Sequence, residues 1–579
     1  MLKRLVKCVR EYKTMVILTL IFIVAEAVIE TLIPFITADL ITDIEQGAGV
    51  NELLPKGFLL IGMAIVSLTC GGVAAFTCSK ASAGFAKNLR HDIFAKVQDF
   101  DFSNIDKFSS SSLVTRMTTD VANVQMSFMM LIRTAIRCPL MLIFSVVAAY
   151  VMGGALSTAF VVVIPVLACG LLLIAKKAMP AFRAVFKKYD RLNESIEENV
   201  RGMRVVKGFS REEHEKQKFG TNAENIRMDF TKAERIVAWN TPLMQLCMNF
   251  NMVFILLIGS KMAIISGSIE IGQISAMLTY GMQILMSLMM LSMIFVIITI
   301  SAESAKRIVE VLNEEPGLTS PEHALTEVKD GSVAFEKVNF KYSEKAKKFA
   351  LASVDFKIES GMTVGIIGGT GSSKTSLVQL IPRLYDATEG RVLVGGEDVR
   401  RYDIKVLRDS VAMVLQKNLL FSGTIRENLQ WGNPNASDEE IREACRLAQA
   451  DDFVMSFPDG YDTKIEQGGT NVSGGQKQRL CIARALLKKP KILILDDSTS
   501  AVDTKTDALI RAGFKSFIPE TTKIIIAQRI ASVEEADLIL VMDQGQIVSA
   551  GTHGELLHTS DIYREVYEQQ TNGGGSDEE

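Results

Sequence analysis

The chain has 579 residues, of which 48% are hydrophobic and 22% are charged, and its formal net charge is −3. One hydrophobic core rarely serves so long a chain, so at least two domains are expected. The net charge is close to zero and there is no long basic tract, so no nucleic-acid partner is expected. High apolar content beside many charges predicts a chain that is part membrane-embedded and part soluble.

Six apolar stretches predict six membrane-spanning helices, since one span needs about 20 apolar residues. The first stretch runs from Met15 past Phe35 and is too long for the apolar region of a signal peptide. The uncharged run at 138–175 is about twice the needed length, and Gly153-Gly154 in its middle predicts a short turn between two spans. The remaining three stretches are 57–79, 236–260 and 271–302.

Lys and Arg residues distinguish the two sides of the membrane. They are frequent between the second and third spans and between the fourth and fifth, whereas the opposite loops contain none. The positive-inside rule therefore predicts that both termini lie in the cytoplasm. The expected location is the cell (plasma or inner) membrane. The two basic segments show helical periodicity, so the spans are expected to continue as helices into the cytoplasm.

Polar and sulfur-containing side chains inside the spans are candidate contacts for a small-molecule cargo. Glu26 and Glu30 share one face of the first span, and Gln245 and Asn249 share one face of the fifth. Carboxylates inside a bilayer are costly and usually face a wet cavity or a partner. Met286 is one of five methionines between positions 282 and 293 of the sixth span, and flexible thioethers suit apolar ligands of different shapes. The alternative is that these methionines only pack against other helices or face lipid.

The boundaries between the domains follow from composition and helix-breaking residues. A membrane domain is expected at 1–312, a linker at 313–330, a soluble domain at 331–568 and a flexible Gly-rich, acidic tail at 569–579. Pro316 and Pro321 end the helix that leaves the membrane.

An apolar strand at 363–367 leads into a glycine-rich loop of the kind that binds phosphate. Backbone N–H groups at a helix start surround the phosphates, a lysine reaches the outer ones and a hydroxyl binds Mg²⁺. One position departs from the usual pattern, because Ser373 precedes the lysine where glycine is expected. The loop and the start of its helix are Gly368, Gly369, Thr370, Gly371, Ser372, Ser373, Lys374, Thr375 and Ser376.

Two further motifs accompany this loop. A buried strand at 491–495 ends in Asp496 and Asp497, the carboxylates expected on the magnesium side of a nucleotide site. Between the loop and this strand stands the sequence Ser473-Gly474-Gly475-Gln476. With this motif the chain resembles the ATP-binding cassette (ABC) proteins, which carry it as a signature.

The resemblance extends along nearly the whole chain. Tyr342 resembles the aromatic residue that stacks on adenine in the family, Gln416 the Q-loop glutamine, and Asp503 the aspartate of the D-loop at 500–503. Segments 106–108 and 202–209 resemble inner loops of ABC exporters. The resemblance is therefore to an exporter half-transporter with both of its domains on one chain.

The family implies a fold and a chemistry. The expected fold is an α-helical membrane domain of six transmembrane helices with long cytoplasmic extensions, followed by an α/β P-loop nucleotide-binding domain. The activity implied is ATP hydrolysis coupled to transport, with ATP and Mg²⁺ as cofactors and Thr375, Gln416 and Asp496 around the metal. Two halves dimerise, and the signature of one half completes the ATP site on the phosphate loop of the other.

Two residues depart from the family pattern for a competent site. Asp497 stands where a glutamate normally polarises the attacking water, and Gln528 stands where a switch histidine contacts the γ-phosphate. Together with Gln416 these are the candidate catalytic residues. Because the signature is intact, the resemblance is to the degenerate-site half of a heterodimer with a second, non-identical half-transporter. The alternative is neutral drift of both residues in a working homodimer.

The expected function is ATP-driven export of amphipathic or drug-like compounds across the lipid bilayer by alternating access. A lipid or peptide exporter shares every motif, and no residue excludes it. An ATP-gated channel or a regulatory subunit is the other alternative.

Overall fold

The computed structural model describes residues 2–344, 346–497 and 504–572. The chain forms two compact units. The membrane unit comprises residues 1–99 and 108–314, and the soluble unit comprises residues 100–107 and 315–579. A short segment between two membrane helices, 100–107, therefore packs as part of the soluble unit.

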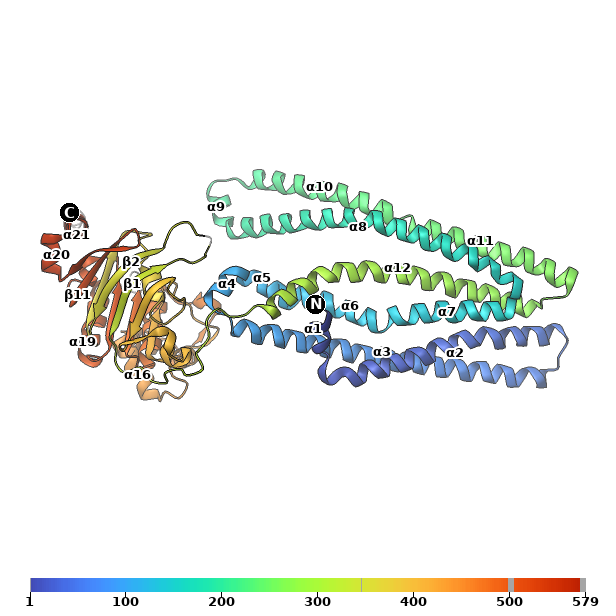
Figure 1. Cartoon of the computed structure of the whole chain (residues 1–579), viewed down its shortest axis with the longest axis horizontal. Helices are drawn as coiled ribbons and strands as arrows, with labels where there is room; N and C mark the ends of the chain where they lie inside the picture. Colours follow the sequence, from blue (N-terminus) through green and yellow to red (C-terminus); the bar gives the residue numbers. More distant parts are fainter. Residues whose placement is uncertain (1, 345, 498–503, 573–579) are drawn as a thin grey trace. The chain divides into compact units, whose positions relative to one another are not determined.

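Long helices form the membrane unit (Figure 1). The longest are α2 (Lys13–Glu45), α3 (Val50–Gln98), α7 (Thr134–Gly153), α8 (Thr158–Arg201), α10 (Glu212–Val237), α11 (Asn240–Lys261) and α12 (Ile271–Asn313). The shorter helices are α1 (Leu2–Lys7), α5 (Ser110–Thr115), α6 (Val121–Ile132) and α9 (Met203–Gly208), with single turns η1 (Arg10–Tyr12), η2 (Arg116–Asp120), η3 (Gly154–Ser157) and η4 (Met262–Ser266).

Within the described residues, five continuous helical stretches are long and apolar enough to cross a membrane. The longest of them, 110–182, contains α7 and the first part of α8, which are separated by a turn at Gly154. Gly154 has a φ of 49°, a backbone conformation that glycine adopts without a steric penalty. Six helices therefore carry the six apolar stretches, as the sequence predicts.

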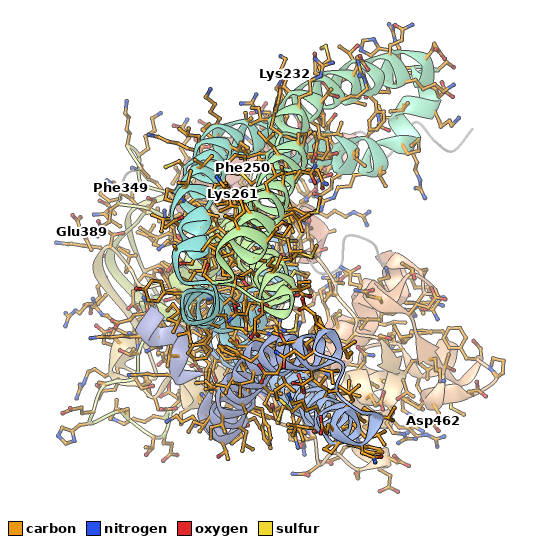
Figure 2. All side chains as sticks on the ribbon, turned by 90° about the vertical axis from the view of Figure 1, so that its right-hand side faces the viewer. Lys232, Phe250, Lys261, Phe349, Glu389 and Asp462 are labelled. Carbon is orange, nitrogen blue, oxygen red and sulfur yellow. The ribbon has the colours of Figure 1, made fainter. Side chains whose placement is uncertain are left out.

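Several helices continue far beyond their apolar stretches. The helix α3 continues to Gln98 and α8 to Arg201, and α8 packs along α10, as Figure 1 shows. Phe182 and Phe230 meet edge to face with ring centroids 6.1 Å apart, and Lys188 forms an ion pair of 2.5 Å with Asp229. Figure 2 labels Lys232 on α10 and Lys261, the last residue of α11.

The soluble unit contains a six-stranded sheet in the order β12-β11-β3-β10-β9-β6, in which all neighbours are parallel except β11 and β12. Its strands are β3 (Thr363–Gly368), β6 (Val411–Val414), β9 (Ile492–Asp496), β10 (Thr522–Ile526), β11 (Leu538–Asp543) and β12 (Gln546–Gly551). Every residue of β9 and β10 is buried, as expected of a parallel sheet that is covered on both faces.

Two smaller sheets and a set of helices complete this unit. The order β2-β1-β4-β5 describes a four-stranded antiparallel sheet, and β7 pairs with β8. These strands are β1 (Val333–Phe340), β2 (Leu351–Ile358), β4 (Glu389–Val394), β5 (Glu397–Asp398), β7 (Gly423–Thr424) and β8 (Lys464–Ile465). The helices are α4 (Phe102–Phe108), α13 (Lys374–Gln379), α14 (Ile404–Ser410), α15 (Ile425–Gln430), α16 (Asp438–Leu447), α17 (Asp451–Met455), α18 (Gly474–Leu487), α19 (Thr504–Phe517), α20 (His553–Thr559) and α21 (Asp561–Asn572). The sequence-predicted fold class, a helical membrane domain followed by an α/β domain, is confirmed.

Candidate functional site

The glycine-rich loop connects β3 to α13 at the carboxyl end of a central strand. A Cβ atom on Gly368 would overlap the carbonyl oxygen of Met542, so only glycine fits at this point. Gly371 has a φ of 84°. Ser373 also lies in the left-handed region, with φ 70° and ψ 25°. A non-glycine residue in that backbone conformation is less stable by about 1–2 kcal/mol, so Ser373 occupies a position that favours glycine.

The lysine and threonine of the loop point to different partners. The Lys374 ammonium donates to the carbonyl oxygens of Gly368 (2.7 Å) and Gly369 (2.9 Å). The Thr375 hydroxyl donates to the Asp496 carboxylate, at 3.1 and 2.9 Å from its two oxygens. Burial lowers the pKa of Lys374, although the charges of Asp496 and Asp497 act against this. Burial also raises the pKa of Asp496.

The Thr375–Asp496 pair fits a magnesium ion. A hydroxyl oxygen and a carboxylate lie side by side at the end of a phosphate-binding loop, and Mg²⁺ prefers such oxygen ligands together with substrate phosphates. Asp496 is buried, so its negative charge would be balanced by a cation at this point. When bound, the metal would neutralise negative charge on the phosphates.

Asp497 and Gln528 are in contact. They follow β9 and β10, which pair in parallel so that Ile526 lies opposite Asp496. The Gln528 side-chain amide donates to Asp497 Oδ2 at 2.8 Å, and the Gln416 amide approaches the same oxygen at 3.5 Å. The three candidate catalytic residues are therefore gathered around one carboxylate oxygen.

Tyr342 lies beside the loop and forms part of an aromatic cluster. Its hydroxyl is 2.7 Å from the Ser376 hydroxyl, and the ring meets Tyr385 edge to face at a centroid distance of 5.2 Å. Tyr385 in turn donates to Asp106 at 2.9 Å and packs against Phe102 of α4, with centroids 5.9 Å apart. Sequence reasoning did not single out Tyr385, because the residue lies outside every motif.

The signature lies at the start of α18. Ser473 caps this helix in a capping box, in which its hydroxyl accepts from the Gln476 N–H and the Gln476 side chain accepts from the Ser473 N–H. Ser473 and Gly474 are exposed, and Gly475 and Gln476 are partly buried. The predicted D-loop residue Asp503 lies outside the described residues.

Comparisons with known proteins agree with this geometry. Residues 16–302 match the family model described as the ABC transporter transmembrane region, and residues 351–500 match the model described as ABC transporter. The chain is 36% identical over 568 residues to the uncharacterized ABC transporter ATP-binding protein YfiB of Bacillus subtilis, covering 98% of each chain. It is 34% identical to YknU of the same organism, over 83% of this chain and 82% of that one.

The chain belongs to the ABC transporter family. A solved bacterial Atm1-family ABC exporter with ATP bound has the same fold, with a TM-score of 0.84 at 23% identity over 97% of this chain and 98% of that one. The soluble unit of this ABC transporter is therefore an ATP-binding ATPase domain, and its membrane unit is the multi-pass transmembrane region.

The two glutamates in the membrane unit of the transporter share one basic partner. The Arg137 guanidinium, on α7, donates to both oxygens of Glu30 at 2.7 and 2.6 Å and lies 3.4 Å from Glu26. Glu26 is buried, and a Cβ atom on Gly71 would lie 3.1 Å from its carboxylate. Sequence reasoning counted Arg137 only toward the basic character of an inner segment, so this ion pair was not predicted.

The other candidate cargo residues lie elsewhere. The Gln245 amide donates to Asn249 at 3.3 Å on an exposed face of α11, as their four-residue spacing predicts. Met286 is 53% exposed on α12. Among the described residues, no hydrogen bond or ion pair joins these three side chains to the two glutamates.

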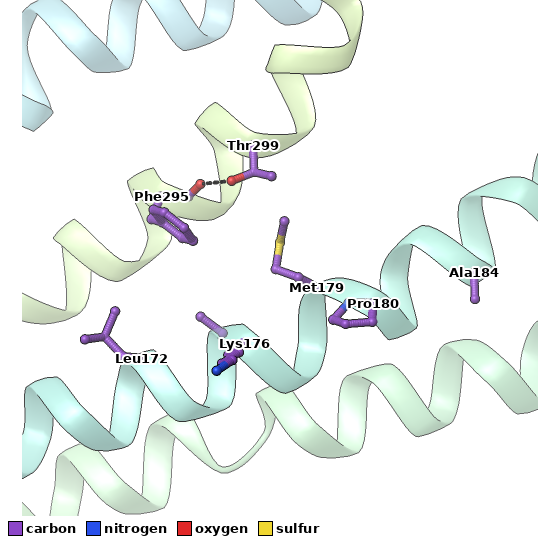
Figure 3. Close-up of a pocket in the computed structure, with 8 residues that line it drawn as sticks. Leu172, Lys176, Met179, Pro180, Ala184, Phe295 and Thr299 are labelled. Atoms are coloured by element: carbon purple, nitrogen blue, oxygen red, sulfur yellow. Dashed lines mark hydrogen bonds between the residues drawn. The ribbon is translucent and has the colours of Figure 1, made fainter.

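A cavity of about 720 Å³ lies between α8 and α12 of the transporter (Figure 3). This volume falls in the usual range for small-molecule sites, and most of the lining is apolar with one lysine. None of the predicted cargo residues lines it. The lining consists of Leu172, Ala175, Lys176, Met179, Pro180, Ala184, Phe295 and Thr299.

Proposed function

We propose that this ABC transporter is the degenerate-site half of a heterodimeric, ATP-driven exporter of amphipathic, drug-like compounds. The observation that carries the proposal is the hydrogen bond of 2.8 Å from Gln528 to Asp497. A hydrogen bond from an amide stabilises the charged carboxylate and so makes Asp497 a weaker base toward the attacking water.

The residues of this chain then favour holding ATP over hydrolysing it. Loop N–H groups and Lys374 would bind the phosphates, while Thr375, Asp496 and Gln416 would surround Mg²⁺. Asp497 is shorter than glutamate by one methylene, and a misplacement of a catalytic group by about 1 Å can cost about 100-fold in rate. Slow turnover at this phosphate loop follows from the two effects together.

Two exposed surfaces support a second chain. Ser473 and Gly474 of the signature are exposed at the start of α18, and the family uses this motif to complete a site on another chain. In the membrane unit, α9 and the residue after it expose Val205 by 62% and Phe209 by 75%, outside the apolar stretches. Large apolar side chains exposed together are typical of a protein–protein contact. Two copies of this chain would contain two impaired sites, so the partner is expected to be non-identical.

The cargo and orientation follow from the membrane unit. The apolar cavity between α8 and α12 suits an amphipathic molecule, and the Glu26–Glu30–Arg137 cluster leaves one carboxylate in excess of its guanidinium. The cluster does not line that cavity, so a cationic group on the cargo would balance this charge at a separate point of the membrane unit. The basic inner segments support a cell-membrane location with both termini in the cytoplasm.

The test compares single substitutions in the purified heterodimer, measured as steady-state ATPase. Ser473→Arg is expected to abolish nearly all turnover, because the signature acts on the partner's competent site. Lys374→Ala is expected to reduce it less, because this side mainly holds ATP. Ser437→Arg is the matched control, since Ser437 caps α16 with the same kind of capping box but lies outside the signature.

The proposal fails if Lys374→Ala is as damaging as Ser473→Arg while the partner's site still binds ATP. Equal loss in Ser437→Arg would show that a broken helix cap, and not the signature, causes the effect. ATP-dependent uptake of a fluorescent amphipathic compound into inside-out vesicles separates an exporter from a channel or a regulatory subunit, because neither of these concentrates the compound.

A further inference from the structure

The N-terminal segment and the neighbouring part of α3 expose many basic side chains. Residues 2–13 and 80–92 together contain eight Lys and Arg residues and only two carboxylates, Glu11 and Asp92. Arg10 pairs with Asp92 at 2.7 Å, and Glu11 accepts from Asn88 at 3.3 Å. Six of the other basic side chains are exposed and form no hydrogen bond or ion pair within the described residues. We call them the basic surface, and they are Lys3, Lys7, Lys13, Lys80, Lys87 and Arg90.

Close packing brings the two segments together. A Cβ atom on Gly84 would overlap the Tyr12 ring, so the absence of a side chain there lets η1 lie directly on α3. One turn along α3, the Asn88 side chain donates to the Cys8 carbonyl at 3.0 Å. Lys80 and Lys87 lie four residues before and three residues after Gly84, so they flank this contact.

The basic surface begins where the apolar surface ends. A hydrogen bond of 2.8 Å between Thr19 of α2 and Thr77 of α3 shows that these two residues lie at the same height along the helix pair. At a rise of about 1.5 Å per residue, Lys13 lies about 9 Å and Lys80 about 4.5 Å from that level, in the same direction because the helices are antiparallel. In the other direction Ile21 is 57% and Phe76 is 68% exposed. Lipid chains would cover these apolar side chains, which places the nearest lysines at the depth of the head groups.

We propose that the basic surface binds the head groups of anionic phospholipids in the leaflet that adjoins the N-terminus. Uncompensated basic clusters next to a membrane helix attract anionic lipids, with about 1 kcal/mol for each Lys or Arg near the surface. The basic side chains are spread along two helices beside exposed apolar residues, an arrangement that fits several lipid head groups and does not enclose a single small anion.

The basic surface is also connected to the end of α12. The Arg4 guanidinium, the remaining basic group of the segment, donates to the Leu312 carbonyl at 3.1 Å. Leu312 lies one residue before the end of α12, which leads by the chain itself into the soluble unit. Lipid bound at Lys3 and Lys7, on either side of Arg4, would therefore hold α1 against the last turn of that helix.

The test uses the purified full-length chain in a neutral detergent, titrated with a fluorescent short-chain phosphatidylglycerol. The variant Lys7→Gln/Lys13→Gln/Lys80→Gln removes three charges of the basic surface, and a loss of about 100-fold in affinity is expected from about 1 kcal/mol each. The matched control, Lys216→Gln/Lys218→Gln/Lys232→Gln, removes three lysines that are ion-paired on α10 and should change the affinity less than threefold. The charge-conserving variant Lys7→Arg/Lys13→Arg/Lys80→Arg should bind like the wild type.

Equal loss in the control variant would overturn the proposal, because net charge and not the basic surface would then govern binding. Equal affinity for a phosphatidylcholine probe would overturn it as well, as would displacement of the lipid by millimolar inorganic phosphate. Loss of binding in the arginine variant would mean that folding or shape, and not charge, is being measured, and it would count against the proposal too.

Discussion

Restoring the usual pair of residues at the phosphate-loop side should speed hydrolysis by the purified chain. The change is Asp497→Glu together with Gln528→His. One methylene advances the carboxylate by about 1.5 Å, and a displacement of about 1 Å is worth about 100-fold in rate. The histidine also removes the amide that now donates to Asp497 at 2.8 Å. We expect turnover to rise between about 10-fold and 100-fold, which corresponds to about 1.4–2.7 kcal/mol of activation free energy.

The assay is steady-state phosphate release by two copies of the chain in one nanodisc at saturating ATP and Mg²⁺, because the signature of one copy completes the site on the phosphate loop of the other. Each single substitution is measured beside the double variant, because Asp497→Glu alone leaves Gln528 in place. Asp497→Asn is the control and should fall below the wild type, since it removes the carboxylate while keeping its shape. A double variant no faster than the wild type would refute the reasoning, and so would an Asp497→Asn variant as fast as the wild type.

Three further results are expected. Glu26→Gln/Glu30→Gln should reduce vesicle uptake of a cationic cargo more than that of a neutral analogue, and equal losses would make the cluster purely structural. Arg137→Gln should destabilise the transporter by about 3–5 kcal/mol in thermal unfolding, because it leaves two carboxylates in the membrane without a cation, and adding Glu30→Gln should recover part of the loss. Tyr385→Phe should lower the free energy of unfolding by about 1 kcal/mol, because it removes the hydrogen bond to Asp106. The ring contact with Tyr342 remains, so ATP affinity should change little. A large loss of ATP affinity would contradict the view that the ring alone supports Tyr342.

The parts of the site that lie within one motif were predictable from the sequence. A strand, a glycine-rich turn and a helix in succession predict the phosphate loop, and the structure places Lys374 and Thr375 accordingly. The end of β9 could be expected at the same sheet edge as that loop, because the carboxyl ends of parallel strands lie along one edge even though β10 separates β9 from β3. The left-handed conformation of Ser373 was also foreseeable, since glycine is usual there.

Contacts between distant segments were not predictable. Arg137 meets Glu30 across 107 positions of sequence, and nothing in the pattern of the third span distinguishes an arginine that faces a helix from one that faces water. Tyr385 meets Asp106 across 279 positions. Such pairs depend on how long helices and sheets are placed side by side, which periodicity does not specify. The cavity between α8 and α12 was not predictable for the same reason, because it depends on how two helices are placed side by side.

The segment 100–107 joins the rest of the soluble unit through non-covalent contacts, because residues 315–579 are linked covalently to the preceding chain only at 314–315. Asp101 accepts from the Gly317 and Leu318 N–H groups at 2.6 and 3.0 Å, which clamps this segment to the start of the linker. The chain therefore passes between the units at 99–100, at 107–108 and at 314–315. A protease that nicks the linker would cut the covalent link to the C-terminal part, so the two fragments would stay together only through contacts such as the hydrogen bond from Tyr385 to Asp106.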